Sequence, residues 1–189
     1  MGIANSVTGI RIVLAPVVAI LLFLPHVPYN LVWSAALFVV AIITDLIDGR
    51  LARAYGESGP VGGHLDGLAD KLLWNLLLFA FVFVGIVPFW FAAVTFTRDA
   101  LATEFKSLAA LRNVKMAVTS FEGKAKVLLQ NIGIGFGFAG MLGLHYGWLT
   151  VAHSSMALNI ALICFVVALA FGLINFSKDL SRNFRKVFA

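Results

Sequence analysis

Four aspartates form two pairs within a short stretch of this 189-residue sequence. Asp45 and Asp48 are three positions apart, and Asp66 and Asp70 are four positions apart. On a helix, either spacing places both side chains of a pair on one face. Four neighbouring carboxylates repel one another unless positive charge lies among them, and carboxylate oxygens suit hard divalent cations. The group therefore predicts a site for a hard divalent cation such as Mg²⁺, Mn²⁺ or Ca²⁺ that two ions can share, with Mg²⁺ or Mn²⁺ expected. Sites of this kind hold substrate phosphates in phosphoryl transfer.

A simpler interpretation is that the four carboxylates are solvated loop residues paired with the nearby cations Arg50, Arg53 and Lys71. Two facing pairs at helix spacing argue against it. Gly49 and Gly62 lie beside the pairs, and small residues let a large flat ligand approach the backbone closely. The metal-site hypothesis is therefore favoured.

The helices that carry these residues are predicted to lie in a membrane. The sequence is 61% hydrophobic and 12% charged, about half the charged fraction of a soluble domain. At about 20 apolar residues per span, its length fits six spans and no separate soluble domain. Six apolar segments are present, near 7–25, 31–50, 66–87, 89–111, 125–145 and 156–176. We expect one all-α integral membrane domain over residues 1–189 with six transmembrane helices.

The connection between segments 31–50 and 66–87 is short. We therefore expect these two helices to be antiparallel neighbours, an arrangement that brings the four carboxylates together near one membrane surface.

The 14 Lys and Arg residues indicate which surface this is. None lies in the connections after the first, third and fifth segments, and cytoplasmic segments carry the excess of Lys and Arg. We therefore expect both termini and the aspartates on the cytoplasmic side of the cell membrane. The pI of about 9.7 then reflects attraction to anionic headgroups. A nucleic-acid partner would require a basic face on a soluble fold, and the sequence indicates no such face.

The stretch from Asp45 to Asp70 resembles the motif of the CDP-alcohol phosphotransferase family. That motif reads D-x2-D-G-x2-A-R-x8-G-x3-D-x3-D, and all eight fixed positions match at the family spacing. The resemblance implies a reaction in which an acceptor hydroxyl attacks the lipid-side phosphorus of a CDP-activated lipid and CMP leaves. It also implies a six-helix plan and a homodimer.

The resemblance further implies roles for individual residues. Asp45, Asp48 and Asp66 would ligate the metal ions, and Asp70 would be a further ligand or the general base. The CDP site would be lined by Asp48, Gly49, Ala52, Arg53 and Gly62.

The position of Arg98 indicates a second site, because it lies about ten residues into segment 89–111. A charge at that depth marks a function by default, unless Asp99 or Glu104 simply neutralises it. Other cations on the predicted cytoplasmic side would join it in binding the phosphate of an acceptor alcohol. The predicted acceptor-phosphate site is Arg98, Arg112, Lys124 and Lys126.

Four short runs resemble the phosphatidylglycerophosphate synthase branch of the family: Asn5-x-x-Thr8-x-x-Arg11, Ala69-Asp70-Lys71-Leu72, Arg98-Asp99 and Gly123-Lys124-x-Lys126. The departures from that branch are Gly67 for Pro, Asp99 for Glu and Val127 for Thr. The resemblance implies CDP-diacylglycerol as donor and glycerol 3-phosphate as first acceptor. Inositol phosphate and phosphatidylglycerol stay as alternatives.

Two other classes of protein compete with the enzyme. A small cation transporter would place charges near the midplane in both halves, often on broken helices, whereas the four aspartates lie near one predicted surface. A membrane scaffold could assemble through the G-x-x-x-G spacings between Gly133 and Gly147, but it gives no reason for four aspartates at this spacing.

Overall fold

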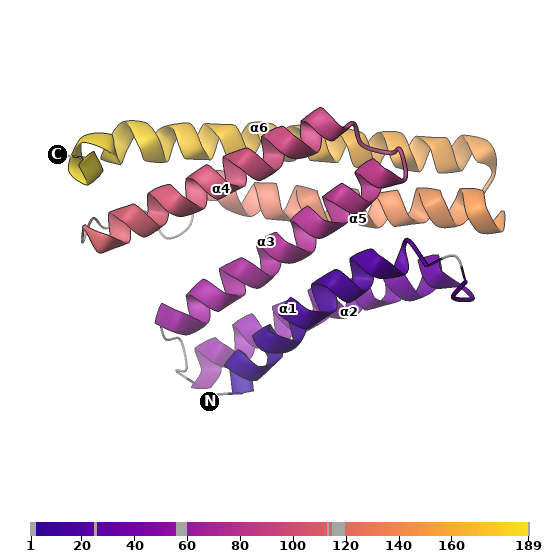
Figure 1. Cartoon of the computed structure of the whole chain (residues 1–189), viewed down its shortest axis with the longest axis horizontal. Helices are drawn as coiled ribbons and strands as arrows, with labels where there is room; N and C mark the ends of the chain where they lie inside the picture. The colour runs from indigo at the N-terminus through magenta and orange to yellow at the C-terminus, as the bar shows by residue number, and fades with distance from the viewer. Residues whose placement is uncertain (1–2, 25, 56–59, 113, 115–119, 189) are drawn as a thin grey trace.

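The computed structural model describes residues 3–24, 26–55, 60–112, 114 and 120–188. The side chains of residues 3–8, 10, 46–55, 60–66 and 188 lie outside that description. The described residues form six α-helices and no strand (Figure 1). The helices are α1 (Ile3–Leu21), α2 (Asn30–Tyr55), α3 (Pro60–Phe83), α4 (Phe89–Leu111), α5 (Phe121–Tyr146) and α6 (Val151–Phe188). The all-α prediction is confirmed, and each predicted segment overlaps one helix.

Within the described residues, two helices, α5 and α6, are long and apolar enough to cross a membrane. Shorter apolar stretches lie in α1 over Arg11–Leu21 and in α2 over Asn30–Asp45. The tail after residue 176 is not a separate helix, because α6 continues through it to Phe188.

Successive helices alternate in direction along the long axis of the molecule (Figure 1). The start of α1 and the end of α6 lie at the same end of the molecule, together with the end of α2, the start of α3, the end of α4 and the start of α5. The end of α1 and the start of α2, the α3–α4 connection and the α5–α6 connection lie at the opposite end. Gly147 ends α5 there with φ 68°, a left-handed conformation that glycine adopts at little cost. This arrangement is compatible with the expected topology, in which both termini and these helix ends face one side of a membrane; the topology itself stays a prediction.

Helix α1 packs against both α2 and α3, and α5 and α6 form a closely packed pair that α4 joins through α6. The direct contact that we expected between α2 and α3 is not found among the described residues. A short connection fixes how far apart two helix ends are, but it does not prevent a third helix from packing against both. Helix α1 takes that place here.

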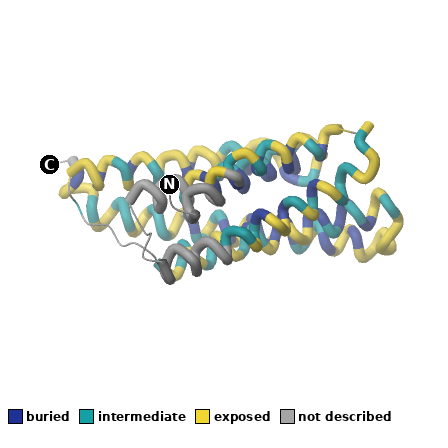
Figure 2. Tube along the Cα trace, turned by 90° about the horizontal axis from the view of Figure 1, so that it is seen from below, coloured by how far each residue is buried: buried dark blue, intermediate teal, exposed yellow. Residues whose placement is uncertain are grey.

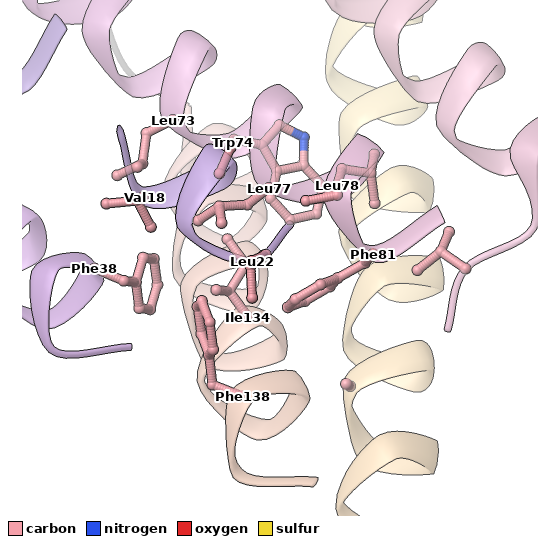
Figure 3. Close-up of a cluster of buried hydrophobic side chains, with 14 of the residues drawn as sticks. Val18, Leu22, Phe38, Leu73, Trp74, Leu77, Leu78, Phe81, Ile134 and Phe138 are labelled. Carbon is pink, nitrogen blue, oxygen red and sulfur yellow. The ribbon is translucent and has the colours of Figure 1, made fainter. Parts of the chain in front are cut away.

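The core contains buried side chains from all six helices, and α3 supplies many of them where it crosses α5 (Figure 3). Phe81 of α3 and Phe138 of α5 are buried with their ring centroids 5.7 Å apart in an edge-to-face arrangement. The ring centroid of Phe38 in α2 also lies 5.7 Å from that of Phe138. This aromatic contact holds the α1–α3 group against the α5–α6 pair.

The outward faces of the helices carry many exposed residues (Figure 2). Several are large and apolar, including Val13, Phe83, Phe89, Trp90 and Leu111. Soluble proteins rarely expose extended apolar surface, so this composition is typical of helices that face lipid chains.

Candidate active site

Arg11 joins the first and last aspartates of the motif. It lies in α1, whereas Asp45 lies in α2 and Asp70 in α3. The Nη1 atom of Arg11 donates to Oδ1 of Asp45 and lies 3.2 Å from Oδ1 of Asp70. The Arg11 side chain is only 2% exposed, but the two carboxylates keep 39% and 42% of their surface. Two acids that are 25 positions apart in the sequence therefore meet at one buried cation, and both stay partly exposed.

Sequence reasoning did not give Arg11 a role, although Arg11 belongs to one of the runs that resemble the synthase branch. A signal was present, because Arg11 is the lone cation within segment 7–25. An ionisable residue within an apolar segment is expected to face the interior and to have a partner.

The remaining motif residues lie on the same two helices. The backbone is helical at Asp48, Gly49, Ala52 and Arg53 in α2 and at Gly62 and Asp66 in α3, but their side chains lie outside the described residues. The helical spacing that places Asp48 one turn after Asp45, and Asp66 one turn before Asp70, is confirmed. The roles assigned to these six residues stay predictions.

The chemistry of this donor set fits a divalent cation. The Oδ1 atoms of Asp45 and Asp70 both contact a single nitrogen of Arg11, so the two carboxylates are close neighbours. Oxygen-only donors at helix spacing are the ligands that Mg²⁺ and Mn²⁺ accept. No group of three or more His, Cys, Asp or Glu is found among the described residues, a set that leaves out the side chains of Asp48 and Asp66.

A second charged cluster joins α4, α5 and α6. Asp99 of α4 is 4% exposed, and its Oδ1 atom lies 2.7 Å from Nη1 of Arg98 and 2.5 Å from Nζ of Lys126. Arg98, which is 8% exposed, also donates from Nη2 to the backbone carbonyl of Gly172 in α6. The predicted alternative, that Asp99 contacts Arg98, is confirmed. One carboxylate therefore faces two cations, which leaves the cluster with a net positive charge.

Gly172 permits this arrangement. A Cβ atom at that position would lie 3.0 Å from Cζ of Arg98, which is closer than ordinary van der Waals contact. Because glycine has no side chain, the guanidinium can lie directly on the α6 backbone.

Lys71 connects the two clusters. It follows Asp70 directly in α3, and its Nζ atom donates to the Thr103 hydroxyl of α4 at 2.8 Å. Thr103 in turn donates to the backbone carbonyl of Asp99 at 2.7 Å. A cavity of about 240 Å³ lies along the same α3–α4 boundary, and its lining includes Lys71, Thr103 and Lys106. The motif and the second cluster are therefore adjacent parts of one polar region.

The four predicted acceptor-site cations divide into two kinds. Arg98 and Lys126 meet on Asp99 inside the helix bundle, whereas Arg112 and Lys124 are exposed. Arg112 caps the C-terminal end of α4 and Lys124 lies in the first turn of α5, so both belong to the same end of the molecule.

Comparison with known families decides what this arrangement represents. The model of the CDP-alcohol phosphatidyltransferase family matches residues 1–174. The chain belongs to the CDP-alcohol phosphatidyltransferase family. The resemblance carried by the eight-position motif is thereby confirmed, and the matched range extends far beyond the motif, into α6.

Individual members of this family are similar over most of their length. A Mycobacterium tuberculosis protein named "Probable phosphatidylglycerophosphate synthase" is 32% identical over 162 residues, covering 84% of this chain and 77% of its own. A Bacillus subtilis protein named CDP-diacylglycerol–glycerol-3-phosphate 3-phosphatidyltransferase is 29% identical over 144 residues, covering 70% and 74%. A Mycobacterium bovis protein, whose name marks it as a candidate cardiolipin synthase, is 30% identical over 125 residues, covering 66% and 58%.

Proposed function

We propose that this protein transfers the phosphatidyl group of CDP-diacylglycerol to glycerol 3-phosphate, giving phosphatidylglycerophosphate and CMP. The observation that carries the proposal is the meeting of Asp45 and Asp70 on Arg11, at the two ends of the family motif. The names of the Mycobacterium tuberculosis and Bacillus subtilis relatives support the choice of donor and acceptor.

Asp70 is proposed to act as the general base. Its carboxylate is partly exposed, so an acceptor hydroxyl can come within hydrogen-bond reach and lose its proton to it. An ordinary aspartate, with a pKa near 3.9, is a weak base. Much of the rate must therefore come from holding the two substrates in line.

Asp45, Asp48, Asp66 and Asp70 would hold one or two ions of Mg²⁺ or Mn²⁺. Divalent ions bound to a pyrophosphate neutralise the charge that develops on its oxygens as the bond to the leaving group breaks. The CDP moiety is proposed to lie against Gly49, Ala52, Arg53 and Gly62.

Arg98 and Lys126 are proposed to bind the phosphate of the acceptor, with Arg112 and Lys124 at the entrance. The support is electrostatic. Because Asp99 offers a single carboxylate to two cations, the cluster keeps a positive charge that suits an acceptor dianion. Phosphatidylglycerol is the second candidate acceptor, favoured by the name of the Mycobacterium bovis relative, and inositol phosphate is the third.

We also propose six membrane spans with both termini and the site on the cytoplasmic side of the cell membrane, and a homodimer as the functional unit. The start of α1, the end of α6 and the facing ends of α2 to α5 lie together at one end of the molecule. That end carries exposed cations such as Arg112, Lys124 and Arg182, which supports this topology.

An acceptor panel tests the proposal. The full chain, purified in detergent, would be given CDP-diacylglycerol with Mg²⁺ or Mn²⁺ and, separately, glycerol 3-phosphate, inositol phosphate, inositol, serine or phosphatidylglycerol. We expect release of CMP and a new phospholipid with glycerol 3-phosphate, and neither in EDTA. Turnover with another acceptor alone would exclude the glycerol 3-phosphate assignment, and no CMP release with any acceptor would favour a non-enzymatic role such as cation transport.

A further inference from the structure

We propose that Arg11 is a positioning residue whose fixed charge holds Asp45 and Asp70 together and weakens the hold of this site on divalent cations. The inference rests on the proposed function, because it takes the aspartates as metal ligands. In this role, Arg11 stabilises the metal-free site and disfavours the metal-bound site.

The contacts of Arg11 are those of a built-in counter-ion. One nitrogen of its guanidinium reaches Asp45 in α2 and Asp70 in α3, and α1 packs against both of those helices. A guanidinium keeps its charge at every physiological pH. The repulsion between the two carboxylates is therefore offset by the protein itself.

The surroundings of Arg11 make this charge hard to replace with water. Ala15, Ala41 and Trp74 lie one helical turn from Arg11, Asp45 and Asp70 respectively, and all three are buried. The ionic contact therefore lies directly against the apolar core on one side. Removing one partner of a buried ionic contact is strongly destabilising, so loss of the Arg11 charge should lower the stability of the metal-free protein.

The same contact opposes metal binding. A divalent ion that approaches Asp45 and Asp70 meets the positive charge of Arg11, so part of its attraction to the carboxylates is cancelled. Loss of the charge should therefore make the metal-free protein less stable and its affinity for Mg²⁺ higher. The stabilisation that an ion supplies grows with its concentration relative to its dissociation constant.

The test is thermal unfolding of the full chain in detergent, in EDTA and in a fixed concentration of MgCl₂. The variants are Arg11→Gln, Arg11→Lys and, as a matched control, Arg182→Gln, which removes an exposed cation from α6. We expect Arg11→Gln to lower Tm most in EDTA. We also expect Mg²⁺ to raise the Tm of this variant by more than it raises the Tm of the unchanged chain. Arg11→Lys keeps a charge without the planar fork, so its gain should be intermediate, and Arg182→Gln should match the unchanged chain.

Equal losses of Tm with and without Mg²⁺ would overturn the inference, because Arg11 would then only join helices. If Arg11→Gln does not fold in either condition, the same comparison on Arg11→Lys decides. If Mg²⁺ does not raise the Tm of the unchanged chain, the proposed metal site itself is contradicted, and this outcome is separate from a failure of the Arg11 inference alone.

Discussion

An ion pair links Lys126 of α5 to Asp99 of α4, with Nζ of Lys126 2.5 Å from Oδ1 of Asp99. That oxygen also accepts from Arg98 of its own helix, α4. Among the described residues, Asp99 is the one carboxylate that forms an ion pair with either cation. Loss of its charge would leave Arg98 and Lys126 inside the bundle without this counter-ion.

Replacing Asp99 with Asn should lower the free energy of unfolding by about 3–5 kcal/mol, the usual cost of breaking a buried ion pair from one side. Denaturant unfolding in detergent measures it. Glu104→Gln is the matched control, because Glu104 lies on the same helix but is exposed, and it should change stability by no more than about 0.5 kcal/mol. Equal stabilities of the two variants would show that Asp99 does not hold the cluster together.

Arg98→Ala should raise the KM for glycerol 3-phosphate about 10- to 100-fold, since a hydrogen bond to a charged group contributes about 1.5–3 kcal/mol. The KM for CDP-diacylglycerol should stay the same, because that substrate is proposed to bind at the Asp45–Asp70 motif. Steady-state assays with each substrate varied in turn make the comparison. An unchanged KM for every phosphorylated acceptor would remove Arg98 from the acceptor site.

The packing of α5 can be tested at two glycines two positions apart. A Cβ atom at Gly137 would lie 2.6 Å from the Phe81 ring, whereas one at Gly135 would meet nothing within 4 Å. Gly137→Ala should therefore destabilise the protein by about 1–3 kcal/mol through overpacking. Gly135→Ala should be neutral or stabilising by up to about 1 kcal/mol, because alanine favours helix. Thermal unfolding of the two variants side by side checks this, and a similar response at both positions would contradict the α3–α5 packing.

The helices could be predicted because their signals are local. Apolar runs and the Asp45–Asp48 and Asp66–Asp70 spacings are properties of short stretches, and each one lies on a helix as expected. The charged cluster around Asp99 could be predicted in part, since Asp99 is the immediate neighbour of Arg98 in the sequence.

What could not be predicted depends on which helices pack together. Arg11 meets Asp70 across 59 positions, and nothing in the length of the connections shows that α1 packs against both α2 and α3. The contact from Arg98 to the backbone of Gly172 spans 74 positions. A side chain that binds a distant carbonyl leaves no pattern in the sequence, because every residue has a carbonyl.

The most direct test of the catalytic assignment is CMP release from CDP-diacylglycerol by Asp70→Asn. Asp179→Asn, which makes the same change of charge on α6 outside the motif, is the control. With glycerol 3-phosphate and Mg²⁺ present, we predict that Asp70→Asn releases CMP about 10²- to 10⁴-fold more slowly than the unchanged chain, while it still unfolds cooperatively in detergent. A full rate of CMP release by Asp70→Asn would contradict the account.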